Sequence, residues 1–245
     1  MNENRVAWNS SAGLSPACAT SLSFTVKTFI ATHTKFAMRG GGHMPIFDAA
    51  NINSTGNSIS STNLNTLELS GKWRDDEKTI NTGPRPRWGN VFNYLDFTNN
   101  TVIGGRLAPV GVPDLLLGGE ISWYSVKHGI ASSKGKIKAY VAVLADGTIA
   151  TSDLYWALGG GANSFALITR FDLQTFPSIL SFLADAHYGS TIETQDAFLA
   201  AVLNMALTND EDLASKMIPV CHWDPAPPLH RRKHSFSQRH LRANI

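Results

Sequence analysis

The segment Phe36–His43 constrains this chain more than any other stretch, because an apolar run ends in an arginine, three glycines and a histidine. Glycine has no Cβ, so three in a row let the backbone turn tightly and come within hydrogen-bond distance of a ligand. Successive free N–H groups in such a turn form a nest that binds anions. The imidazole that follows could act as a nucleophile toward the bound group. The residues of this predicted site are Arg39, Gly40, Gly41, Gly42 and His43.

A less specific interpretation of the same segment stays open. Three glycines also suit a plain flexible turn, and His43 would then be an ordinary turn histidine. Arg39 would in that case form a local salt bridge instead of contacting an anion.

The composition is that of a globular protein with a sizeable core. Of the 245 residues, 43% are hydrophobic and 16% are charged, and the net charge of +2 is too small to indicate nucleic-acid binding. Much of the positive charge lies in the last sixteen residues, so the remainder is slightly acidic. The basic residues of that segment are Arg231, Arg232, Lys233, Arg239 and Arg242.

Cysteines and apolar segments exclude several other classes of protein. Cys18 and Cys221 lie far apart and neither belongs to a CxxC pattern, so no metal site is predicted. The two could form a disulfide, but nothing in the sequence supports one. The polar N-terminus lacks the apolar core of a signal peptide, and no segment is long and apolar enough to span a membrane.

Short strands and short helices are interrupted by glycine turns as far as about Pro177, which predicts an α+β domain. The hydrophobic periodicity predicts helices at 20–31, 87–95 and 153–158. It predicts strands at 35–38, 66–70, 78–82, 101–103, 137–144 and 165–171. The segment 51–62 is rich in Asn and Ser and is predicted to be a loop. Trp88 and Trp156 are expected in the core.

The character of the sequence changes after Pro177. Residues 194–207 form an amphipathic pattern, with an expected inner face of Phe198, Leu199, Val202, Leu203, Ala206 and Leu207. From Trp223 the chain is rich in proline and then basic, without an apolar period, and is expected to be disordered.

An ordered set of motifs over most of residues 8–178 resembles the FAD-linked oxidases with a vanillyl-alcohol-oxidase-type (PCMH-type) flavin domain. The similarity is to the branch that includes berberine bridge enzyme and 6-hydroxy-D-nicotine oxidase. The motifs are residues 36–43, 83–89, 104–106, 110–112, 115–119 with 121–122, 143–147, 153–158, 160–161, 163–165 and 169–171. Each alone is weak, but their order is specific.

The resemblance implies FAD as the cofactor, lying between two α+β subdomains. The turn Arg39–Gly42 would surround the diphosphate, and His43 would carry a covalent bond to the flavin ring. Further cofactor-binding residues would be Gly104, Gly105, Val110, Gly111, Gly118 and Ile168. The implied activity, of a kind found in secondary metabolism, is oxidation of a small organic molecule by hydride transfer to the flavin.

Several residues depart from the family's pattern. Leu107 stands where some members have a cysteine that makes a second flavin bond, so at most one covalent bond is expected. Pro113, Asp114, Glu120 and Ala162 stand where small residues, mostly glycines, are usual. A carboxylate buried beside a phosphate would repel it, unless Asp114 and Glu120 point to solvent. No catalytic base is assigned, because the family's base comes from a region that has little counterpart here.

The expected organisation has three parts: an FAD-binding domain at 1–178, a remnant of an α+β substrate domain at 179–222, and a disordered basic tail at 223–245. The expected partner is a small-molecule substrate, with neither nucleic acid nor membrane. A competing hypothesis is a non-catalytic fragment that binds flavin weakly or serves as an interaction module. Exposed apolar surface, where the missing domain would pack, would then make it dependent on a partner. The sequence identifies neither the substrate nor the oligomeric state.

Overall fold

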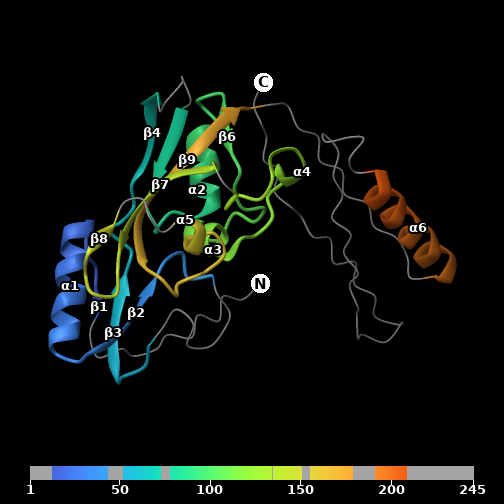
Figure 1. The fold of residues 1–245 in the computed structure, drawn as a ribbon. Coiled ribbons are helices and arrows are strands. Elements are labelled where there is room, and N and C mark those ends of the chain that lie inside the picture. Colours follow the sequence, from blue (N-terminus) through green and yellow to red (C-terminus); the bar gives the residue numbers. More distant parts are fainter. Residues whose placement is uncertain are drawn as a thin grey trace. The chain divides into compact units, whose positions relative to one another are not determined.

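Figure 1 shows the chain as a computed structural model. The structure describes residues 13–43, 52–72, 78–133, 135–150, 155–178 and 191–208. The chain divides into two compact units, Met1–Ser178 and Ile179–Ile245. The first unit contains two sheets with short helices, and the described part of the second is a single helix. The predicted α+β class is confirmed.

A small parallel sheet and a helix form one part of the first unit. The strands are ordered β1 (Gly13–Leu14), β3 (Gly56–Ser60) and β2 (Lys35–Arg39), and the helix is α1 (Ala19–Ala31). The Cys18 side chain caps α1 by accepting a hydrogen bond from the Ser21 amide. Leu22, Val26 and Phe29 of α1 pack on Ile59 of β3. The predicted helix at 20–31 and strand at 35–38 are confirmed.

The predicted loop at 51–62 is wrong over its second half, where β3 forms the central strand of this sheet. The polar composition of residues 56–60 conceals this strand in the sequence. Ile59 is fully buried, and in the ladder it lies between Met38 of β2 and Leu14 of β1. Pairing on both sides satisfies the backbone of β3, so tertiary context overrides the weak β-propensity of its Asn and Ser residues.

A six-stranded antiparallel sheet forms the other part of the first unit. Its order is β4-β5-β9-β7-β8, and β6 pairs with the distal part of β9. The strands are β4 (Leu67–Lys72), β5 (Lys78–Thr82), β6 (Asn100–Val102), β7 (Ile137–Val143), β8 (Ile149–Ala150) and β9 (Leu167–Pro177). The five strands predicted for this region are confirmed, and β9 extends to Pro177. Val143 of β7 belongs to the same core cluster as Leu22 of α1 and Ile59 of β3, and this cluster connects the two sheets.

Four short helices pack with this sheet. They are α2 (Trp88–Leu95), α3 (Val112–Gly118), α4 (Ser125–His128) and α5 (Tyr155–Leu158). Trp88, Leu115, Leu116 and Phe171 are among the fully buried side chains of the shared core. The predicted helices at 87–95 and 153–158 are confirmed, although 151–154 lie outside the described residues. The prediction that Trp156 lies in the core is wrong, because this residue is 94% exposed.

The described part of the second unit is α6 (Ile192–Thr208), which confirms the predicted helix. Its expected inner face is not buried. Leu199 is 60% exposed and Leu207 75% exposed, and no described residue of α6 is buried. An apolar stripe predicts which face can pack but not that something covers it. The expected disordered tail lies outside the described residues.

No helix in the described ranges has the length and apolarity needed to cross a membrane.

Candidate functional site

The predicted anion-binding turn begins where β2 ends. Ser61, just beyond the neighbouring strand β3, fixes it: its amide donates to the Arg39 carbonyl at 3.2 Å and its hydroxyl donates to the Gly40 carbonyl at 3.3 Å. Gly42 has φ +72°, a left-handed conformation that glycine adopts without strain. Gly41 is buried, whereas Gly42 and His43 are exposed. The turn therefore has one side against the protein and one side open.

The two glycine-rich stretches of the sequence meet at this turn. A Cβ added to Gly41 would lie 2.4 Å from the Gly111 Cα, and one added to Gly111 would lie 2.8 Å from the Gly41 Cα. A Cβ on Gly40 would lie 2.7 Å from Pro113. These glycines are therefore required where the backbone of one stretch crosses the other. We call Gly40, Gly41, Gly42 and Gly111 the glycine crossing.

Unpaired amides remain at the glycine crossing. Within the described part of the chain, the N–H groups of Gly41, Gly42 and His43 donate no hydrogen bond. The Gly111 amide, in contrast, donates to Asp114 Oδ2 at 3.2 Å. Consecutive free amides next to a left-handed glycine are the donors of an anion nest.

Arg87 is a residue of this site that the sequence analysis missed. It immediately precedes α2 and forms an isolated β-bridge with Gly111. Its Nη2 donates to the Gly41 carbonyl at 3.2 Å, whereas its buried Nε has no hydrogen-bond partner. The available signal was the Arg-Trp-Gly triplet after a proline-rich turn, which is part of the motif at 83–89.

Trp88 organises the remaining glycines. Its amide donates to the Val110 carbonyl at 3.0 Å, and its side chain is fully buried, as expected for a core aromatic. A Cβ on Gly104 or Gly105 would lie 2.3 Å from the indole ring, so these glycines let the chain lie against it. The indole Nε1 is buried and has no partner. Gly104, Gly105 and Val110 are thus placed beside the residue that follows Arg87.

The last two predicted cofactor-binding residues lie elsewhere in the first unit. Gly118 is exposed at the far end of α3, about 10 Å along the helix axis from its start. Ile168 lies in β9, paired with Ala142, and its side chain is 3% exposed within the core. The roles of both residues stay predictions.

Most of the residues that depart from the family's pattern lie where the structure tolerates them. Pro113 lies in the first turn of α3, where a backbone N–H has no partner within the helix, so proline costs no hydrogen bond there. Glu120 is exposed, and Ala162 adopts the left-handed φ of +52° that normally favours glycine. Leu107 is 53% exposed. Asp114 is the exception, because its carboxylate lies at the glycine crossing.

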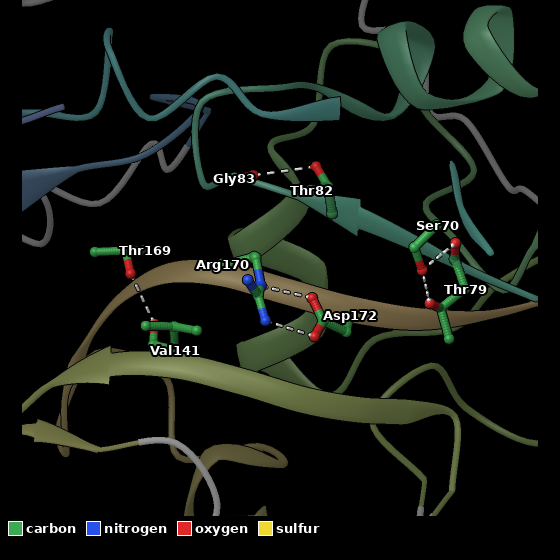
Figure 2. A network of polar contacts seen from close by, with 8 residues as sticks. All are labelled: Ser70, Thr79, Thr82, Gly83, Val141, Thr169, Arg170 and Asp172. Atoms are coloured by element: carbon green, nitrogen blue, oxygen red, sulfur yellow. Dashed lines mark hydrogen bonds and ion pairs between the residues drawn. The ribbon is translucent and has the colours of Figure 1, made fainter. Parts of the chain in front are cut away.

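A second polar cluster lies in the six-stranded sheet, and Figure 2 shows its members. Arg170 Nε lies 2.8 Å from Asp172 Oδ1, and Arg170 Nη2 donates to Asp172 Oδ2 at 3.0 Å. Burial raises the pKa of Asp172, and the bonds from Arg170 partly offset that effect. Thr169 donates to the Val141 carbonyl at 3.1 Å, and the hydroxyls of Ser70 and Thr79 contact each other. The Thr169–Val141 and Ser70–Thr79 contacts join neighbouring strands, whereas Arg170 and Asp172 pair within β9.

The donors at the glycine crossing fit a diphosphate. Three free amides and the guanidinium nitrogens of Arg87 can all donate to phosphate oxygens, and the crossing offers little side-chain bulk. No group of three potential metal ligands occurs among the residues that the structure describes. The chemistry of this donor set is therefore anion binding.

Curated relatives carry FAD-dependent names, although no family model matches the chain. The chain is 43% identical over 151 residues to the FAD-dependent monooxygenase tpcD of Cochliobolus heterostrophus, covering 59% of this chain and 28% of the relative. It is 37% identical over 198 residues to the FAD-dependent monooxygenase prx3 of Penicillium roqueforti, covering 78% and 36%. This chain thus spans about a third of the length of these relatives.

Solved structures share the fold. One is 6-hydroxy-D-nicotine oxidase of Arthrobacter nicotinovorans, with a TM-score of 0.59 and 20% identity, covering 67% of this chain and 36% of that one. Another is berberine bridge enzyme, with a TM-score of 0.59 and 20% identity, covering 67% and 33%. The chain therefore has the fold of the vanillyl-alcohol-oxidase-type flavoproteins, and its sequence relatives are named FAD-dependent monooxygenases.

Proposed function

We propose that this chain is the FAD-binding part of an oxidoreductase that oxidises a small organic molecule. The observation that supports this most directly is the glycine crossing, where unpaired amides, Arg87 and the exposed His43 converge on one turn. The FAD-dependent names of the relatives point to the same cofactor. Because the chain spans about a third of those relatives, activity and substrate belong to the proposal.

Each part of the crossing has a distinct task in this proposal. The amides of Gly41 and Gly42 bind the diphosphate, and the crossing of Gly41 with Gly111 fixes their direction. His43, next in the chain and exposed, holds the flavin ring through a single covalent bond. When bound, FAD would supply the chemistry by accepting a hydride from the substrate.

The test is whether the purified full chain carries flavin, and whether that flavin is covalently bound. The expected preparation is yellow, and its colour stays with the protein after acid precipitation. His43→Ala should still bind FAD but release it into the acid supernatant. His33→Ala, which changes another exposed histidine, is the control and should retain acid-stable colour. A chain that stays colourless after refolding with FAD would overturn the proposal.

The alternative is a flavin-binding fragment without turnover, or an interaction module. It is favoured by the apolar side chains that the described residues leave exposed, among them Trp156 and Phe97, which is 90% exposed. Under this alternative the chain binds flavin, but no small-molecule alcohol or amine reduces that flavin. Anaerobic absorbance of the bound flavin across such a panel separates the two, because bleaching requires turnover.

A further inference from the structure

We infer that Arg87, and not Arg39, is the side chain that neutralises the FAD diphosphate. The inference rests on the proposed function and assigns to that site a residue that the sequence analysis did not predict. It begins from a contrast between two arginines that both lie at the glycine crossing.

Arg87 approaches the turn from inside the fold. Its Nη2 donates to the Gly41 carbonyl at 3.2 Å, so the guanidinium is held at the turn that would bind the anion. Its Nε is buried and has no hydrogen-bond partner, and leaving a charged group's donor buried without an acceptor is unfavourable. No ion pair joins Arg87 to a carboxylate within the described ranges. Among the described residues, Arg87 is therefore a cation at the turn with no carboxylate paired to it.

Arg39 lacks these features. It is exposed at the end of β2, and its Cδ lies 3.4 Å from where a Gly42 Cβ would be, so its aliphatic stem runs along the turn. An exposed charge acts through water, whereas a partly buried one acts through a lower effective dielectric and interacts more strongly. Of the two cations, Arg87 thus offers the larger stabilisation to an anion.

Asp114 is the charge that opposes this role. Its Oδ2 accepts the Gly111 amide and lies 3.7 Å from the position of a Gly41 Cβ. A diphosphate bound at the crossing would therefore be repelled by this carboxylate. The repulsion gives an independent prediction: Asp114→Asn should tighten FAD binding severalfold, whereas Glu120→Asn, at an exposed site, should not change it.

The experiment measures FAD binding by flavin fluorescence in the full chain carrying His43→Ala, so that binding is reversible. In that background, Arg87→Met should raise the Kd about 10- to 100-fold, the loss expected for hydrogen bonds to a charged group. Arg39→Met and the matched control Arg85→Met, which alters another exposed arginine, should change it less than about threefold.

Two readouts separate a charge contact from a purely structural role. Arg87→Lys keeps the charge and should recover part of the affinity, and Arg87→Met should lower the dependence of Kd on salt concentration. Arg87 would have a structural role, and the inference would be overturned, if Arg87→Met lost affinity without changing the salt dependence of Kd and Arg87→Lys did not recover that affinity. A larger loss in Arg39→Met would also overturn the inference.

The failures of the two proposals are distinguishable. A His43→Ala parent that binds no FAD overturns the proposed function and the inference together. A parent that binds FAD as tightly as its Arg87→Met variant overturns the inference alone.

Discussion

Two arginines show how differently the same side chain is used in the two parts of the first unit. In the six-stranded sheet, Arg170 meets Asp172 with two contacts, and both residues lie on β9 (Figure 2). At the glycine crossing, Arg87 donates to the Gly41 carbonyl and has a buried Nε without a hydrogen-bond partner. The first cluster is closed, because its two charges pair with each other, whereas the second is open, because no carboxylate among the described residues pairs with Arg87.

The largest expected effect concerns the crossing itself. Gly41→Ala places a Cβ 2.4 Å from the Gly111 backbone, where nothing flexible can yield, and should lower the free energy of unfolding by about 3 kcal/mol. Gly118→Ala, whose nearest neighbour would be 3.7 Å away, is the control and should lose nothing. Urea denaturation of both variants measures this. Equal stabilities would mean that the two glycine stretches do not cross closely.

The next effect tests whether the sheet cluster is structural. Arg170→Met leaves Asp172, which is 3% exposed, without its partner and should cost about 2 kcal/mol at neutral pH. This is less than for a fully buried pair, because the Arg170 side chain is 44% exposed to solvent. Adding Asp172→Asn to Arg170→Met should recover much of the loss in a denaturation experiment. An undiminished loss in the double variant would contradict the account.

Arg87→Met should have a smaller effect on the flavin-free chain, about 1 kcal/mol, since it removes one net hydrogen bond to a carbonyl. The measurement is again the free energy of unfolding, compared directly with that of Arg170→Met. If Arg87→Met proves the more destabilising of the two, the contrast between a closed and an open cluster is wrong.

The smallest effect is a pH dependence at Asp172. Burial raises its pKa above the ordinary 3.8, so its contribution to stability is greatest below that pH and is lost as the pH rises through the raised value. Asp172→Asn, which never ionises, should therefore lose less stability than the parent between about pH 4 and pH 7, by about 1 kcal/mol or less.

Asp146 provides a control of opposite sign. Hydrogen bonds from Thr148 lower the pKa of its exposed carboxyl, so its contribution is present above pH 3.8 and is lost as the pH falls. Thermal melts of Asp146→Asn and of the parent below about pH 4 should show the reverse trend, because only the parent loses this contribution as the pH falls there. Parallel curves for the two variants would refute the assigned cause of the Asp172 shift.

Sequence reasoning predicted most elements of the first unit because their signals are local. Hydrophobic periodicity or glycine and proline turn signals within a few residues mark the turn after β2, the helix at Trp88 and the strands of the large sheet. Sequence reasoning missed β3, whose only strong apolar anchor is Ile59 and whose stability comes from strands on both sides.

The candidate site was predicted in part, for the same physical reason. The glycine turn and His43 are contiguous, so their pattern is visible in the sequence. Arg87 was missed because its role depends on Gly41, which the fold brings to it from a distant part of the chain. Likewise, nothing local to Trp156 or to the apolar stripe of α6 indicates whether another segment covers them.

The most direct test of the central claim is a crystal structure of the full chain with FAD bound. The account predicts diphosphate oxygens within hydrogen-bond distance of the Gly41 and Gly42 amides and of the Arg87 guanidinium. A diphosphate bound away from this turn, with these donors facing solvent or protein, would contradict it.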